Sequence, residues 1–192
     1  MKAYKGFRKD LTCTMGKGAY QFEIDKWHKE KKAQCCNTGF HCTDNPLDVL
    51  CYYRNDDDRY FIVEAAGDIH EDDVNSRIAC TEIRLVKEIT KSQLIIAGLI
   101  FMKEHPKRKN SSIVAKDKGA TSSDYVIVRG KNPKAAGRIG SILYLVKEGA
   151  DGSVEELGMY EVDGKEIKPD KYYNVRGERV YEKKRLRKAK NS

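Results

Sequence analysis

Residues 106–140 divide this chain of 192 residues into two parts of different character. The stretch is rich in Gly, Ser, Ala and Lys and has few of the large apolar residues that build a core. Within it, SSIVAKDKG and SSDYVIVRG match at an offset of eleven residues. This pattern indicates either two degenerate copies of a repeat, as in a β-roll, or a long linker with one strand.

The part before this stretch, residues 1–105, combines strand and helix signals. AYKGF, AYQFEIDKWH, RYFIVEAAGDI and RIACTEIRLVKEI are typical of strands, and we expect the first two to pair as a hairpin. SQLIIAGLIFMKEH predicts a buried helix with Ser92 as its N-cap, although Gly98 disfavours helix. The interpretation is an N-terminal mixed α/β domain.

A short helix over residues 46–53 is predicted by its start signals. Asn45 is a good N-cap, Pro46 suits the first helical position, and Asp48 favours the helix dipole from the first turn. Leu47 and Leu50 then fall on one face, together with Cys51, which is typical of a helix packed on a core.

Residues 141–182 predict a small antiparallel β meander. SILYLVKE and SVEELGMYEV flank the turn GADG, and a second turn lies at Asp163-Gly164. So few strands make a marginal domain, which predicts self-association as a dimer or trimer. The chain as a whole is therefore expected to have an α+β fold.

Residues 183–192 form a basic tail, which we expect to be disordered. They hold six Lys and Arg and no acid, so removing them from the net charge of +8 leaves +2. The tail predicts weak, nonspecific affinity for nucleic acid rather than a dedicated interface. The chain shows no signal peptide, and its longest apolar run, 94–102, is too short to span a bilayer, so a cytoplasmic protein that does not enter a membrane is expected.

The six cysteines all lie in the first 80 residues, and we interpret them as reduced thiols. A metal site would draw on the densest group of thiols and imidazoles: Cys13, Cys35, Cys36, His41 and Cys42. That group lacks paired C-x-x-C spacings, so no metal or other cofactor is expected. A nucleophilic pair of Cys42 and His41 is disfavoured because neighbours in an extended segment face opposite ways. No catalytic motif is present, which leaves enzymatic activity uncertain and disfavoured.

Three segments carry a resemblance to a known family. AYKGF with DLTC, then GFHCTDNPLDVLCYY, then RYFIVEAAGDI, resemble a domain family that is common in phages and mobile elements. Its members show roughly KGF, GFHxCxNPLDV, YY and a VExxG strand, and the likeness covers about residues 1–95. Residues 141–182 resemble the C-terminal part of such proteins, whose inserts resemble the β-roll repeats of trimeric adhesin heads. The resemblance implies a phage or prophage origin and no catalytic residues.

These observations lead to a functional hypothesis with two alternatives. The leading one is a non-enzymatic phage or prophage accessory protein that binds a host defence protein or sequesters a nucleotide signal. The alternatives are an enzyme similar to ADP-ribosyltransferases, which would use Tyr4, a tyrosine pair and Glu64, and a phage structural or assembly protein. A cleft in the first part would favour a small ligand, and a flat surface a protein partner. The candidate ligand-binding residues are Tyr4, Lys5, His41, Tyr52, Tyr53 and Glu64.

Overall fold

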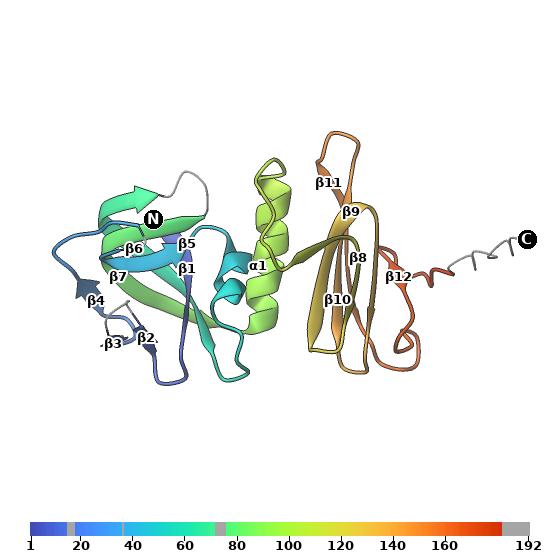
Figure 1. Cartoon of the computed structure of the whole chain (residues 1–192), viewed down its shortest axis with the longest axis horizontal. Helices are drawn as coiled ribbons and strands as arrows, with labels where there is room; N and C mark the ends of the chain where they lie inside the picture. The colour runs from blue at the N-terminus through green and yellow to red at the C-terminus, as the bar shows by residue number, and fades with distance from the viewer. Residues whose placement is uncertain (15–17, 36, 72–75, 182–192) are drawn as a thin grey trace, which may run out of the picture. The chain divides into compact units, whose positions relative to one another are not determined.

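The computed structural model describes residues 1–14, 18–35, 37–71 and 76–181 (Figure 1). The chain divides into two compact units, Met1–Ile113 and Val114–Ser192. Twelve strands, one α-helix and one 3-10 helix make up the regular structure of the described residues. The architecture is therefore mostly β, and the expected α+β class, with its mixed α/β first domain, is wrong.

The first unit is built on a sheet that closes on itself. Its strands are β1 (Lys2–Phe7), β2 (Thr12–Thr14), β3 (Ala19–Gln21), β4 (Trp27–Lys29), β5 (Phe40–Thr43), β6 (Arg59–Glu71) and β7 (Arg77–Ile89). β7 pairs with β5, β5 with β1, β1 with β6, and β6 again with β7, so these four strands form a ring. β4 pairs with β7 along the same edge as β5 but further along the strand. β2 and β3 form a separate hairpin.

Alternating apolar residues fill the interior of this ring. In β6, Phe61, Val63 and Ala65 are buried and belong to one core cluster, while the residues between them are partly exposed. Phe7 packs edge-to-face on Phe61 with ring centroids 5.5 Å apart. The period of two that predicted these strands thus places one face of each strand in the core.

The expected hairpin between AYKGF and AYQFEIDKWH is wrong. β1 pairs with β5 and β6, whereas β3 pairs with β2, and β3 and β4 are separate strands. The positive φ of Asp25, 59°, accompanies the break between β3 and β4. Local turn residues predicted the wrong partner because long-range burial decides strand pairing here.

Two short helical segments lie against the ring. The six-residue 3-10 helix η1 (Pro46–Cys51) begins after Asn45, whose side chain accepts a hydrogen bond from the Leu47 N–H. The α-helix α1 (Lys91–Glu104) begins after Thr90, which forms a capping box with Gln93, so the expectation of Ser92 as cap is wrong. In the described part of the chain, no helix combines the length and apolar character needed to cross a membrane.

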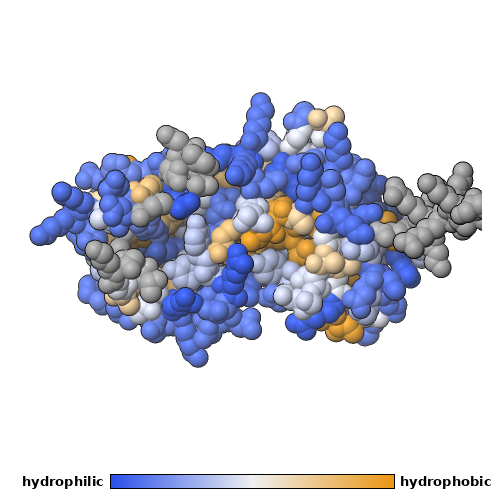
Figure 2. Space-filling view, in the orientation of Figure 1, coloured by the Kyte–Doolittle hydropathy of each residue, from blue (hydrophilic) through white to orange (hydrophobic). Residues whose placement is uncertain are grey.

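Gly98, which disfavoured the helix in sequence terms, has a packing role in α1. A Cβ atom on residue 98 would collide with the side chain of Leu47 in η1, so glycine lets the two helices approach closely. Leu94 and Leu99 are buried on α1, whereas Ile96 and Ile100 remain exposed. The space-filling view shows a mostly hydrophilic face over the strands of this unit (Figure 2).

The second unit is a five-stranded sheet with an unexpected parallel part. It contains β8 (Val114–Thr121), β9 (Tyr125–Gly137), β10 (Ile142–Glu148), β11 (Val154–Glu161) and β12 (Tyr173–Asn174). β10 and β11 form an antiparallel hairpin around the GADG turn, whereas β8–β9 and β9–β10 pair in parallel. The segment over 106–140 therefore contains both β8 and β9.

Successive parallel strands joined by so few residues imply that the chain coils. Only residues 122–124 connect β8 to β9, whereas a flat parallel pair needs a crossover of about a dozen residues. Strand β8 bends instead: its register against β9 shifts between Lys116 and Lys118, where Asp117 has φ of 60°. Each strand thus carries the chain around a turn, as in a parallel coil.

Candidate ligand-binding site

A cavity of about 890 Å³ opens in the first unit, within the range of small-molecule sites. Four segments line it: β1 with the start of β2, β5, η1 with the two tyrosines after it, and residues 107–112, which follow α1. The lining also includes Asn37 and Gly39, which precede β5, and Ser76 and Arg77 at the start of β7. Each of these segments belongs to the first unit.

The cavity exists because β1 and β5 separate. β1 follows β6 over six residue pairs, but it is in register with β5 at a single pair, Tyr4 and Thr43. A continued antiparallel ladder would place Gly6 opposite His41. The two strands diverge there instead, and the space between them becomes the inner end of the cavity.

Lys5 occupies this divergence. Its ammonium group donates a 2.6 Å hydrogen bond to the His41 carbonyl oxygen, an acceptor that a continued ladder would have used. The residue is 7% exposed, and its Nζ also lies about 5.5 Å from the ring centroids of Phe7 and Phe22. Among the described residues, no carboxylate forms an ion pair with it. A buried ammonium group without a counter-charge is costly, so the cavity favours an anionic group at this end.

Three tyrosines, Tyr4, Tyr52 and Tyr53, form an aromatic wall of the cavity, on the outer face of the sheet at β1 and β5. Tyr53, which follows η1, lies directly on Gly6, where any Cβ atom would overlap its ring. Burial raises the pKa of Tyr53, so its hydroxyl group stays protonated. Tyr4 lines the same cavity, as does Tyr52, which is 62% exposed. Such rings can stack on a planar, aromatic ligand.

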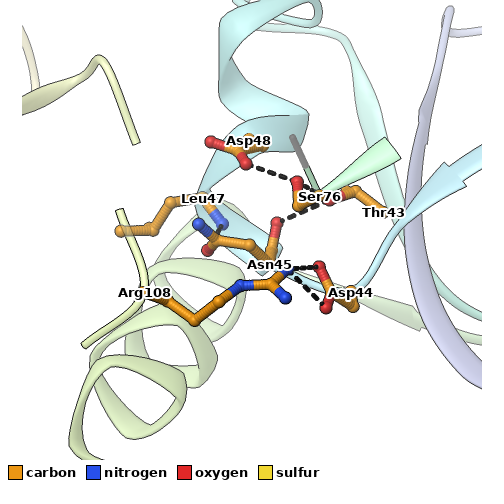
Figure 3. A network of polar contacts seen from close by, with 7 residues as sticks. All are labelled: Thr43, Asp44, Asn45, Leu47, Asp48, Ser76 and Arg108. Carbon is orange, nitrogen blue, oxygen red and sulfur yellow. Dashed lines mark hydrogen bonds and ion pairs between the residues drawn. The ribbon is translucent and has the colours of Figure 1, made fainter. Parts of the chain in front are cut away.

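A polar network fixes the junction between β5 and η1 (Figure 3). Ser76 donates a hydrogen bond to the Asp48 carboxylate and also bonds to the hydroxyl group of Thr43. Asn45 lies between these groups and the first turn of η1, where its Oδ1 accepts from Leu47 N at 3.2 Å. The network holds η1 against the sheet and thereby positions the tyrosines that follow it.

The segment 107–112 crosses η1 and is attached at both ends. Near the start of η1, the guanidinium group of Arg108 donates to both carboxylate oxygens of Asp44, at 3.1 and 2.9 Å (Figure 3). Near its end, the Cys51 thiol lies 3.5 and 3.3 Å from the hydroxyl oxygens of Ser111 and Ser112. These contacts bring a basic run to the rim of the cavity.

The charge of the cavity is strongly positive. Among the described residues that line it, Asp48 is the only acid, and six residues carry Lys or Arg side chains: Lys5, Arg8, Arg77, Lys107, Arg108 and Lys109. Arg8 lies 3.7 Å from Asp58, and Arg108 contacts Asp44, but Lys107 and Lys109 form no ion pair with a described residue. The excess of positive charge attracts anions.

Two thiols and one imidazole of the cavity have shifted pKa values. Burial raises the pKa of the Cys13 thiol, and a hydrogen bond with Cys80, together with burial, raises the pKa of the Cys42 thiol well above its usual range. Burial, assisted by the charge of Lys5, lowers the pKa of His41. Neutral thiols are poor nucleophiles, so Cys13 and Cys42 are not activated as nucleophiles.

The structure brings five of the six candidate residues from the sequence to one cavity: Tyr4, Lys5, His41, Tyr52 and Tyr53. Glu64 is not among the lining residues. Its carboxylate accepts a 2.7 Å ion pair from Arg84 on the neighbouring strand. The carboxylate that an ADP-ribosyltransferase-like site would need therefore pairs with Arg84 and does not line the cavity.

The candidate metal ligands do not form a cluster in the described residues. No group of three or more His, Cys, Asp or Glu residues there has the arrangement to hold a metal ion. Cys35 donates from its thiol to the backbone oxygen of His70, and Cys42 lies in the core. Cys36 lies outside the described residues.

Sequence reasoning missed the rim of the cavity. Residues 107–112 fall in the segment that the sequence predicts to be a repeat or a linker, although the run Lys107–Lys109 is the kind of basic signal that marks an anion site. Gly6 and Ser76 gave no local signal, because their roles depend on partners that are distant in the chain.

Fold and cavity together define a small, β-rich domain with a cavity lined by basic and aromatic residues. Residues 1–97 match the model of a family described as a domain of unknown function (DUF7666), and the chain belongs to that family. No curated protein matches the chain, and neither does any solved structure. The basic rim at 107–112 lies beyond the residues that the family model matches.

Proposed function

We propose that this chain is a non-enzymatic phage or prophage accessory protein that sequesters a nucleotide in the cavity of its first unit. The observation that carries the proposal is the buried ammonium group of Lys5, which lines the cavity and has no carboxylate partner among the described residues. A phosphoryl group would supply the missing negative charge. It would also accept hydrogen bonds from the ammonium N–H groups that do not donate to the His41 carbonyl oxygen.

The aromatic wall supports a nucleotide over a simple anion. Tyr4, Tyr52 and Tyr53 line the same cavity as Lys5 and can stack on a base. The volume of about 890 Å³ is far larger than inorganic phosphate requires. A cavity of this kind also favours a small ligand over a host protein as the principal partner.

The phage or prophage context supports a role in counter-defence. Residues 1–95 resemble a family common in phages and mobile elements, and the Cys13 and Cys42 thiols of the cavity are not activated as nucleophiles. A protein that binds a nucleotide signal without converting it lowers the free concentration of that signal. The proposed place of action is the cytoplasm of the host cell.

Calorimetric titration with AMP and ATP tests this function. We expect at least one of them to bind with a dissociation constant below ~100 μM. Lys5→Met should abolish that binding without lowering the melting temperature, because a similar apolar side chain replaces a buried, uncompensated charge. The matched control is Lys29→Met, which removes an exposed lysine that pairs with Glu82.

Native mass spectrometry of the protein purified from cells gives an independent reading of the ligand. A retained species with the mass of a nucleotide supports the proposal. Absence of binding by both nucleotides at ~1 mM, or equal binding by wild type and Lys5→Met, overturns it.

A further inference from the structure

Four of the six basic residues that line the cavity lie at two separate places, and the other two are Arg8 and Arg77. The inner place is the Lys5 ammonium group, held at the His41 carbonyl oxygen by a 2.6 Å hydrogen bond between the separated strands. The outer place is the basic run Lys107–Lys109, whose Arg108 is held by the Asp44 carboxylate. Both places are anchored to β5 and the residue that follows it, so their separation can be judged along that strand.

His41 and Asp44 are three residues apart on extended backbone. At about 3.3 Å per residue, their anchoring positions are roughly 10 Å apart. Hydrogen bonds to phosphoryl oxygens are about 3 Å long, so one phosphoryl group that contacts Lys5 is not the group that Arg108 contacts. The two cationic places therefore suit two anionic groups.

The region between the two places is lined mainly by aromatic and hydroxyl groups, with Arg77 opposite Thr43 on β7. Tyr4 and Thr43 meet there as the single register pair of β1 and β5, and Tyr53 covers Gly6 beside them. A nucleoside fits such a region, because its base can stack on tyrosine while its sugar bonds to hydroxyl groups. The phosphoryl groups would then extend from opposite sides of the sugar.

We infer that the ligand is a nucleoside with phosphoryl groups on both its 3′ and 5′ oxygens, as in a nucleoside 3′,5′-bisphosphate or a linear or cyclic dinucleotide. This inference rests on the proposed nucleotide-binding function and specifies its ligand. One phosphoryl group lies at Lys5, and the other lies at the basic run Lys107–Lys109.

The outer place is suited to a second phosphoryl group because its cations are available. Lys107 and Lys109 are exposed and form no ion pair with a described residue. Arg108 contacts Asp44 through one terminal nitrogen, so its planar guanidinium group keeps further donors for a ligand. The inner place is closed, while the outer place is open to solvent, which lets the chain of a dinucleotide continue outward.

The test uses three probes: adenosine 3′,5′-bisphosphate, adenosine 5′-monophosphate and adenosine 3′-monophosphate. Calorimetric titrations compare the wild type with Lys5→Met and with the double variant Lys107→Ala/Lys109→Ala. The matched control is Lys31→Ala/Lys32→Ala, which removes two exposed lysines of the same unit that do not line the cavity. Circular dichroism melting verifies that each variant is folded.

We expect the bisphosphate to bind the wild type at least tenfold more tightly than either monophosphate. Lys5→Met should weaken the binding of adenosine 5′-monophosphate and leave that of adenosine 3′-monophosphate unchanged, and Lys107→Ala/Lys109→Ala should do the reverse. The control should leave the affinities of all three probes unchanged.

Two results overturn the inference and leave the proposed function intact. In the first, a monophosphate binds as tightly as the bisphosphate. In the second, Lys5→Met and the double variant weaken the same monophosphate. Failure of all three probes to bind the wild type instead overturns the proposed function itself.

Discussion

The ring of Tyr53 lies directly against the backbone of Gly6, so close that a Cβ atom on residue 6 would overlap the ring carbons. Glycine at this position of β1 therefore sets the place of one aromatic side chain in the cavity. The contact joins the ring of strands to the segment after η1, and it can be tested without any ligand.

Replacing Gly6 with Ala should cost about 1–3 kcal/mol of stability, the usual cost of overpacking a well-filled site. In a Tyr53→Ala background the overlap is absent, so the same change should be neutral or stabilising, because alanine suits a strand better than glycine. Urea denaturation of the four proteins measures this double-mutant cycle. Equal costs in both backgrounds would show that Tyr53 does not press on residue 6.

The start of η1 provides a second test. Asn45 is 6% exposed, and its Oδ1 accepts a hydrogen bond from Leu47 N. Asn45→Ala should lower the free energy of unfolding by about 1 kcal/mol, whereas Asn45→Ser, which keeps a capping oxygen, should cost less. Urea denaturation measures both. An unchanged midpoint in the alanine variant would contradict the capping role.

Local signals in the sequence were sufficient for part of this fold. Asn45 and Pro46 marked the start of η1, and alternation of apolar residues located β6 and β7. These features depend on neighbours within a few residues, which a single sequence displays. The same holds for the hairpin of β10 and β11, which the turn residues GADG predict.

One feature that failed was local, and the others depend on distant partners. Ser92 looked like a cap, but Thr90 has a Gln three residues later and forms the capping box. The parallel pairing of β8 and β9 lies in a segment whose composition is typical of a linker. For the site, the tyrosines and His41 were found, yet the separation of β1 from β5, which creates the cavity, leaves no mark on either strand.

Stability should depend on pH through His41. Burial, with help from the charge of Lys5, lowers the pKa of His41 in the folded state below its ordinary value of about 6.5. Below about pH 6.5 the unfolded chain therefore binds a proton at His41 more readily than the folded chain does. The contribution of His41 to the free energy of unfolding is complete above about pH 6.5 and is lost as the pH falls below that value.

The measurement is the difference in unfolding free energy between pH 7.5 and pH 5.5. His41→Asn should lose less stability over this interval than the wild type, since asparagine does not titrate. His70→Asn, at an exposed position, is the matched control and should follow the wild type. If His41→Asn lost as much unfolding free energy as the wild type between pH 7.5 and pH 5.5, other groups would produce the pH dependence.

The basic tail supports a separate prediction about nucleic acid. Residues 183–192 lie outside the described residues, and their sequence holds six basic residues and no acid. Truncation after Glu182 should leave the melting temperature unchanged and abolish weak binding to DNA. In the full chain that binding should weaken steeply with salt, because phosphate contacts release counterions. Tight DNA binding by the truncated protein at physiological salt would place a nucleic-acid site elsewhere.

Self-association through the second unit is the last prediction. This unit has its own core cluster, which includes Val128, Leu143 and Leu145, but β11 at the end of its sheet exposes Leu157 and Met159. An end strand presents unpaired backbone groups, and apolar side chains on it favour a second copy of the chain. We therefore expect a dimer or trimer at micromolar concentration.

Sedimentation equilibrium decides between these states and a monomer of about 22 kDa. The double variant Leu157→Glu/Met159→Glu should shift the mass toward the monomer, because it places like charges on the end strand of both copies. Lys147→Glu/Glu155→Lys reverses an ion pair between β10 and β11 and is the matched control, since it keeps the net charge and the apolar surface. A monomeric wild type would mean that the exposed side chains of β11 are simply solvated, and the oligomer would then be excluded.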